Sequence, residues 1–183
     1  GEPIMSDKEW DDLYFELQSL EKKYGQSLES SPTRKIHFEK VSELKKVKHS
    51  HPMLSLDKTK NIEEIKSFVG NKDWIAMLKM DGLTCSLLYE NGRLVKAETR
   101  GDGDIGEDIT HNAMVIPSIP KRMPYTSRVV VDGEIICKLD DFKAFANEYK
   151  NARNFASGSI RLLDSEECAK RKLTFVAWDY IVG

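Results

Sequence analysis

Cysteine, long apolar runs and net charge are all scarce in this sequence, and each scarcity excludes a class of protein. The three cysteines among 183 residues, Cys85, Cys137 and Cys168, are odd in number and far apart. Neither a disulfide framework nor a paired-cysteine metal site is therefore predicted. No apolar run approaches the roughly 20 residues that span a bilayer, and no basic segment followed by an apolar one opens the chain. We expect a cytoplasmic protein with no membrane contact.

The formal net charge is only −2, so contact with nucleic acid must come from local basic patches or from parts of a longer protein. The content of 40% hydrophobic and 32% charged residues is typical of a globular domain. Histidine is also rare, with 4 residues. His49 and His51 could bind a metal together, but no second cluster supplies the remaining ligands of a tetrahedral site. We predict no metal ligands in this chain.

The first part of the chain has the pattern of an amphipathic helix and a linker. Residues 6–9 have the form of a capping box, and apolar residues recur at helical spacing over residues 7–24. Residues 26–50 are polar and are interpreted as a linker or an extended crossing. We place a partial helical subdomain with its linker in residues 1–48 and the main domain in residues 49–183.

The main body combines strands with short helices. Residues 74–80 and 83–89 are strand-like, and Asn91-Gly92 is a two-residue hairpin signal that leads into a strand over residues 93–99. Further expected elements are a helix between the cap Asn61 and Gly70, β-rich runs over residues 128–137 and 173–178, and a helix that opens at Asp140 and carries Phe142, Phe145 and Tyr149. The predicted class is α+β, with mostly antiparallel sheets, flanking helices and a small helical subdomain in front.

Residues 99–110, TRGDGDIGEDIT, contain both a G-x-G-x-x-G and an aspartate-rich loop pattern. A dinucleotide finger needs free helix N-terminal amides and an acidic residue about 20 positions later. Here Glu107 stands where phosphates would sit, and residues 121–127 contain no carboxylate. A calcium loop counted from Asp102 would need its glycine at position 107. Both interpretations fail. The remaining interpretation is a turn that leaves the preceding strand, and it gives Arg100 no role.

Lys79 stands at the end of an alternating row that also contains Ile75 and Met77. Burial on such an apolar face would lower the pKa of its ammonium group, and only the free amine is a nucleophile. Lys79 is therefore a candidate for covalent catalysis. The alternative is a solvated lysine at a strand end, followed by an Asp81-Gly82 turn.

An ordered set of motifs covers nearly the whole chain and resembles the adenylation domain of bacterial NAD-dependent DNA ligases. The matching segments are residues 6–11 (SDKEWD), 31–33 (SPT), 52–57 (PMLSLD), 79–83 (KMDGL), 89–92 (YENG), 99–110, 133–134 (GE) and 153–161 (RNFASGSIR). The wider nucleotidyltransferase superfamily shares only the K-x-D-G and the later Gly-Glu. The resemblance implies an incomplete nucleotidyltransferase, ATP-grasp-like ligase fold.

The resemblance also implies a mechanism and its residues. Lys79 would attack the AMP phosphorus of NAD, release nicotinamide mononucleotide and hold AMP as a phosphoramidate, which then activates the 5′-phosphate of a DNA nick for sealing. Asp81 would orient the amine or its metal, Arg100 would contact ribose or phosphate, and Glu134 would bind ribose. Nicked double-stranded DNA would be the partner of the full-length protein, and Mg²⁺ is implied by the chemistry.

Further matched residues concern the choice of donor and the surroundings of AMP. Ser55 and Leu56 match the segment that lines the adenosine side of the pocket. A single helix face would present the residues that close on nicotinamide mononucleotide and select NAD over ATP, namely Asp7, Trp10 and Asp11. Basic residues that could meet NAD phosphates or the DNA backbone are Arg153, Arg161, Lys170, Arg171 and Lys172. The alternative for this set is a run of solvated charges.

Two departures from the family pattern bear on function, besides the mild exchange of the family's usual tyrosine for Trp10. Met77 stands at the adenine-reading position that is usually glutamate, and Asp132 replaces the arginine before Gly-Glu. The family's Tyr-His pair and two later pocket lysines are not in this sequence. We therefore expect a monomeric fragment of a longer ligase that does not seal DNA alone and self-adenylates weakly.

Two other functions remain open at this point. One is another lysine-dependent nucleotidyltransferase, such as an ATP-dependent ligase or a capping enzyme. The other is a non-catalytic relative that binds NAD or nicked DNA, for which Met77 and Asp132 are the reasons. Donor choice and covalent labelling of Lys79 separate these alternatives.

Overall fold

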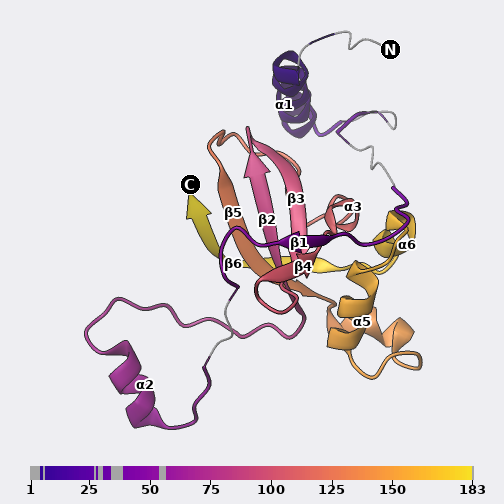
Figure 1. The fold of residues 1–183 in the computed structure, drawn as a ribbon. Helices are drawn as coiled ribbons and strands as arrows, with labels where there is room; N and C mark the ends of the chain where they lie inside the picture. The colour runs from indigo at the N-terminus through magenta and orange to yellow at the C-terminus, as the bar shows by residue number, and fades with distance from the viewer. Residues whose placement is uncertain are drawn as a thin grey trace. The chain divides into compact units, whose positions relative to one another are not determined.

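The computed structural model describes residues 5, 7–26, 28, 31–33, 39–53 and 57–182; within these it leaves undescribed the side chains of Asp7, Lys8, Trp10, Asp11, Phe15 and Val182. The chain divides into two units, residues 1–37 and residues 38–183 (Figure 1). This geometric division lies earlier in the chain than the functional boundary expected at residue 48, which stays a prediction.

The first unit contains one helix, α1 (Asp7–Tyr24), among its described residues, which confirms the helix predicted from the capping box and the apolar spacing. Gly25 follows with φ +63° and ends it. The Thr33 hydroxyl hydrogen-bonds the Glu21 carboxylate and ties the following turn to the last turns of the helix. The side chains of Asp7, Trp10 and Asp11 lie outside the described part, so their role stays a prediction. Over the described residues, no helix is both long and apolar enough to cross a membrane.

The second unit is built on a four-stranded antiparallel sheet in the order β3-β2-β5-β6. Its strands are β2 (Leu83–Glu90), β3 (Arg93–Thr99), β5 (Val129–Ile136) and β6 (Thr174–Val182). Asn91 and Gly92 have φ values of +50° and +73°, as a tight hairpin between β2 and β3 requires. The predicted hairpin, the β-rich run at 128–137 and the strand that begins near residue 173 are confirmed, as is the α+β class.

One face of this sheet is apolar and carries the core. On β2, the side chains of Cys85, Leu87 and Tyr89 alternate onto this face and are almost fully buried. Three helices cover it, α3 (Thr110–Ala113), α5 (Ala152–Ile160) and α6 (Ser165–Ala169), and Figure 1 shows them gathered on one side of the sheet. Phe155 of α5 is completely buried, with the ring of Phe145 stacked 4.5 Å away. Neither α5 nor α6 was predicted.

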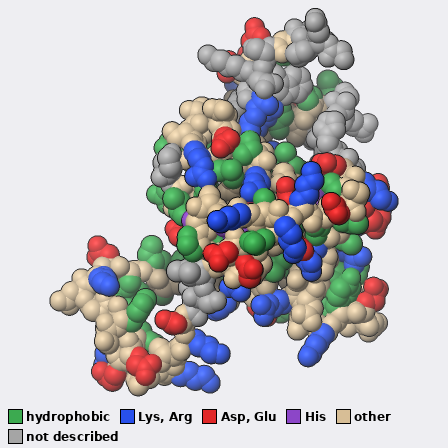
Figure 2. Space-filling model, in the orientation of Figure 1, with side chains coloured by type: hydrophobic (Ala, Val, Ile, Leu, Met, Phe, Trp, Pro, Cys, Tyr) green, Lys and Arg blue, Asp and Glu red, His purple; other side chains and the backbone are tan. Residues whose placement is uncertain are grey.

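The opposite face of the sheet is polar and is crossed by a second, two-stranded sheet. Strand β1 (Lys46–Lys48) pairs antiparallel with β4 (Ile105–Glu107), and both cross in front of the larger sheet in Figure 1. Basic and acidic side chains are intermingled over this side of the molecule (Figure 2). Residues 26–50, expected to be a linker or an extended crossing, thus contain a strand that the polar sequence did not indicate.

Two other predictions need correction. The strand expected over residues 74–80 is wrong, because this segment has no regular secondary structure and pairs with no strand within the described part of the chain. The alternating apolar residues of this segment therefore do not form a buried face. The helix expected from Asp140 is shorter, with α4 (Leu139–Phe142) followed by one 3₁₀ turn, η1 (Lys143–Phe145).

The helix predicted at Asn61 is confirmed as α2 (Ile62–Val69), capped by the Asn61 side chain at 2.9 Å from the Glu63 amide nitrogen.

The two sheets meet at Gly106, and a side chain there should destabilise the fold. A Cβ on Gly106 would lie 1.8 Å from the Thr99 carbonyl oxygen, so we expect Gly106→Ala to lower the free energy of unfolding by about 2–3 kcal/mol in urea denaturation. Gly158→Ala is the control. Its Cβ would come no closer than 3.7 Å to Tyr149, and alanine in a helix should raise stability by about 0.5–1 kcal/mol. Equal effects of the two substitutions would contradict the packing described here.

Candidate functional site

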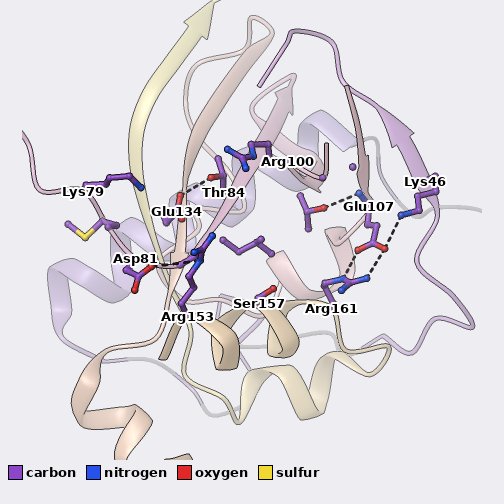
Figure 3. A pocket seen from close by; sticks show the side chains of 16 residues that line it. Lys46, Lys79, Asp81, Thr84, Arg100, Glu107, Glu134, Arg153, Ser157 and Arg161 are labelled. Atoms are coloured by element: carbon purple, nitrogen blue, oxygen red, sulfur yellow. Dashed lines mark hydrogen bonds and ion pairs between the residues drawn. The ribbon is translucent and has the colours of Figure 1, made fainter. Parts of the chain in front are cut away.

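A cavity of about 380 Å³ opens where β2 begins and β3 ends. Its walls come from the segment before β2, from the β1–β4 sheet, from β5 and from one side of α5. The charged and hydroxyl side chains that line it (Figure 3) are Lys46, Lys79, Asp81, Thr84, Thr99, Arg100, Glu107, Glu134, Arg153, Ser157 and Arg161. Five of these are basic and three acidic, so the lining favours an anionic ligand.

Six residues singled out from the sequence lie in this lining although they come from separate parts of the chain, namely Lys79, Asp81, Arg100, Glu134, Arg153 and Arg161. Met77 is not among the lining residues, and its side chain is 61% exposed. Ser55 and Leu56 lie outside the described residues. The structure thus brings together the group expected around AMP, while the contacts of that group with a ligand stay a prediction.

Lys79 reaches the cavity from the unpaired segment before β2. The buried apolar row expected to hold it does not exist, because Ile75 and Met77 are exposed and so is Lys79 itself. The argument that burial prepares its amine is therefore wrong for this structure. In Figure 3 the Lys79 side chain extends toward the strand that carries Glu134.

Glu134 forms part of the floor of the cavity on β5. The β2–β5 register places it opposite Thr84, whose hydroxyl donates to a Glu134 carboxylate oxygen at 3.0 Å. Partial burial raises the pKa of the Glu134 carboxyl, and the Thr84 hydrogen bond and the charges of Lys79 and Arg153 oppose that rise. Glu134 is therefore a fixed hydrogen-bond acceptor beside two cations.

Arg153 connects α5 to the turn that holds the K-x-D-G motif. Its Nε donates to the Gly82 carbonyl oxygen at 3.1 Å and lies 3.7 Å from the Asp81 carboxylate. A Cβ on Gly82 would lie 2.0 Å from the Ile135 carbonyl oxygen, so only glycine allows this close approach to β5. The turn that follows Lys79 is thus held between a strand and a helix.

Glu107 organises the other side of the cavity, and sequence reasoning missed its role. Its carboxylate accepts two hydrogen bonds from the Arg161 guanidinium, at 2.5 and 2.9 Å, and one from Lys46 at 3.2 Å. The hydrogen bond from Arg161, assisted by Lys46, holds the pKa of Glu107 below its ordinary value against partial burial. Because Arg161 is engaged in this way, a phosphate would have to compete for it. No sequence signal joins the three residues, which come from β4, the end of α5 and β1.

The glycine- and aspartate-rich stretch at residues 99–110 contains the turn between β3 and β4 at residues 100–104, followed by β4 and the start of α3. One Asp102 carboxylate oxygen accepts hydrogen bonds from the Ile105 amide at 2.8 Å and the Asp104 amide at 3.0 Å. These amides lower the pKa of the Asp102 carboxyl. The loop satisfies two of its own amides with its own carboxylate, so those amides are not free to bind a phosphate as a dinucleotide finger would, and the rejection of the calcium loop stays a prediction.

The basic run at residues 170–172 is largely engaged within the protein. Lys170 lies 2.7 Å from the Glu167 carboxylate and Lys172 lies 3.8 Å from Asp141. The Arg171 guanidinium lies 5.1 Å from the centre of the Phe145 ring. These contacts favour a local structural role for the run.

An antiparallel α+β domain with a cavity lined by more basic than acidic side chains defines a class of protein suited to binding an anionic ligand. The chain belongs to the NAD-dependent DNA ligase adenylation domain family, whose model matches residues 41–182. The family membership indicated by the ordered motifs is thereby confirmed.

Curated relatives match nearly the entire chain. It is 45% identical over 185 residues to a protein named DNA ligase from Lachnoclostridium phytofermentans, covering 97% of this chain and 28% of that protein. The DNA ligases of Ruminiclostridium cellulolyticum and Mycoplasma genitalium are 42% and 41% identical, covering 97% and 94% of this chain and 28% of each relative. The chain thus spans less than a third of the length of these relatives.

The Glu107–Arg161 pair predicts a pH dependence of stability. The pKa of Glu107 is lower in the folded state than its ordinary value of 4.5, so the pair stabilises the fold above about pH 4.5, and this contribution disappears as the pH falls through the folded-state pKa. We expect Arg161→Gln to lower the free energy of unfolding by about 0.5–1 kcal/mol at neutral pH, a modest value because Arg161 is half exposed.

Urea denaturation of both proteins between about pH 3 and pH 7 measures this difference, which should shrink toward acid pH. Lys143→Gln, which removes a fully exposed pair with Asp140, is the control and should change stability by less than about 0.5 kcal/mol. A difference for Arg161→Gln that is constant over the whole range would show that Glu107 does not depend on Arg161.

Proposed function

We propose that this chain is the adenylating part of an NAD-dependent DNA ligase. The Lys79 Nζ attacks the phosphorus of the AMP half of NAD, the new N–P bond replaces the bond to the bridging oxygen, and nicotinamide mononucleotide leaves with that oxygen while the amine loses a proton. AMP then passes to the 5′-phosphate of a nick, where the 3′-hydroxyl displaces it. The observation that carries the proposal is the convergence of Lys79 with Arg100, Glu134 and Arg153 on one cavity.

The chemistry of the lining supports distinct tasks for these residues. Phosphoryl transfer depends mainly on positioning and on stabilising charge. Arg100 and Arg153 supply planar donors for phosphate or ribose, and Glu134 accepts hydrogen bonds from ribose hydroxyls. Asp81, two residues after the nucleophile, lies beside Arg153. Lys79 is exposed here, so an apolar pocket does not activate its amine. We assign this activation to the bound substrate and to the charged side chains around it.

NAD, rather than ATP, is the proposed AMP donor. The support is the family to which residues 41–182 belong and the resemblance of the Asp7, Trp10 and Asp11 helix face to the segment that closes on nicotinamide mononucleotide. Ser55 and Leu56 are the proposed adenosine-side contacts, with Met77 at the adenine-reading position.

Magnesium fits this chain only as a partner of the substrate phosphates. The described residues contain no group of three His, Cys, Asp or Glu side chains that could hold a metal ion, and Glu134 is already bonded to Thr84. No step is assigned to a protein-bound metal. Nicked double-stranded DNA is the proposed partner of the complete protein, in a cytoplasmic location, and the names of the relatives support the DNA assignment.

Covalent labelling tests the proposal directly. The longest natural form of the protein is incubated with NAD or ATP, and we expect mass spectrometry to find one AMP on the peptide that contains Lys79 with NAD only. Lys79→Arg should keep the charge and abolish labelling, since a guanidinium is not a nucleophile. The control Lys72→Arg, on the same exposed segment and outside the cavity lining, should label normally. Labelling by ATP alone would overturn the donor assignment, and a labelled Lys79→Arg would overturn the nucleophile.

Glu134 provides a second test, because its role concerns binding and not bond formation. Glu134→Gln keeps the size of the side chain but removes the carboxylate that accepts from ribose. We expect the dissociation constant of NAD to rise about tenfold in isothermal titration calorimetry, while labelling at saturating NAD falls by less than about threefold. The control Glu63→Gln alters an exposed pair with Lys66 on α2 and should leave NAD binding unchanged.

A further inference from the structure

His49 lies under the end of strand β3 with both ring nitrogens facing hydrogen-bond acceptors. Its Nδ1 is 2.7 Å from a Glu98 carboxylate oxygen, and its Nε2 is 2.8 Å from the Arg100 backbone carbonyl oxygen. The His49 side chain is 1% exposed and that of Glu98 is 8% exposed. Water therefore cannot replace either partner.

This arrangement bears on the protonation of the ring. A neutral imidazole has one donor nitrogen and one acceptor nitrogen, whereas a carboxylate and a carbonyl can only accept. The Lys96 ammonium lies 2.6 Å from the other Glu98 oxygen, so the group that faces His49 is a carboxylate and not a carboxyl. Both ring nitrogens of His49 thus face an acceptor, an arrangement that a doubly protonated ring satisfies.

The rest of the segment holds this ring against the Arg100 turn. The His49 amide donates to the Asp104 carbonyl at 2.9 Å, and the Met53 amide donates to the Gly103 carbonyl at 3.1 Å. A Cβ on Gly106 would lie 2.8 Å from the His49 ring, so the ring needs the glycine beside it. The ring thus adds a side-chain contact to the Arg100 carbonyl oxygen, which also accepts from the Gly103 amide at 3.0 Å, at the point where the Arg100 side chain enters the cavity (Figure 3).

We propose that His49 is a positioning residue for the adenylation reaction, which fixes Arg100 by clamping its backbone carbonyl to the Glu98 carboxylate through a doubly protonated ring. The inference rests on the proposed function, because Arg100 has a task only if a nucleotide binds in the cavity. His49 touches no substrate itself. It acts by preventing the strand end from rotating the Arg100 guanidinium away from the ligand.

Neighbouring His51 supplies a comparison within the same segment. Its Nε2 lies 2.7 Å from an Asp132 carboxylate oxygen on β5, which provides the partner for one of the two departures from the family pattern. His51 contacts no residue that lines the cavity through this bond, so it serves as the control.

Two substitutions separate positioning from simple support of the fold. In His49→Asn the amide nitrogen takes the place of Nδ1 and keeps the bond to Glu98, whereas in His49→Gln it takes the place of Nε2 and keeps the bond to the Arg100 carbonyl. We expect His49→Asn to lower kcat/KM for lysyl-AMP formation from NAD about tenfold, and His49→Gln and His51→Gln to lower it by less than about threefold. Thermal unfolding should rank the two His49 variants in the opposite order, because the bond to the carboxylate is the stronger one.

The outcomes are distinguishable. ¹⁵N NMR of the wild-type protein at neutral pH should show protons on both His49 ring nitrogens, and a ring with one bare nitrogen would overturn the assignment. If His49→Asn adenylates as fast as His49→Gln, or if rate and stability fall in the same order, His49 only supports the fold and the inference fails alone. If the wild-type protein forms no lysyl-AMP, the proposed function fails and the inference falls with it.

Discussion

The register between β2 and β5 is the constraint on which the rest of this structure depends. It places Thr84 opposite Glu134 and Ser86 opposite Asp132 on one face, while Cys85 and Leu87 point into the core on the other. Because side chains alternate along a strand, a slip of one residue would turn the carboxylates into the core and the apolar residues into the cleft. Both the hydrophobic core and the floor of the cavity follow from this one pairing.

The segment from β1 to His51 covers the polar sheet face and supplies hydrogen-bond partners for its buried carboxylates, and Glu107 of β4 has its partners on β1 and at the end of α5. His49 pairs with Glu98, His51 with Asp132, and Lys46 and Arg161 with Glu107. A buried carboxylate without a partner would be strongly destabilising, since its desolvation would not be compensated. The bonds of His49 to Glu98 and to the Arg100 carbonyl, and those of Arg161 to Glu107, stabilise the crossing and also hold residues of the cavity wall, so stability and the arrangement of the site are coupled there.

The sequence predicted the local elements with strong local signals. The capping box of α1, the Asn-Gly hairpin between β2 and β3 and the Asn61 cap of α2 all depend on residues within a few positions of each other, and all are confirmed. The wrong predictions concern segments whose alternation or polarity was interpreted without knowing which strands lie beside them. Residues 74–80 alternate like a strand but have no pairing partner in the described chain, and the polar segment before residue 50 contains β1.

Residue type and order were enough to establish the ordered motifs, the family and the candidate residues Lys79, Asp81, Arg100, Glu134 and Arg153. What surrounds these residues followed from the three-dimensional packing alone. The structure shows that Lys79 is exposed rather than buried, that Glu107 engages Arg161, and that His51 accounts for Asp132. The physical reason is that the two pairs each join segments more than fifty residues apart, so only the packing of the two sheets and α5 brings these charges within hydrogen-bonding distance.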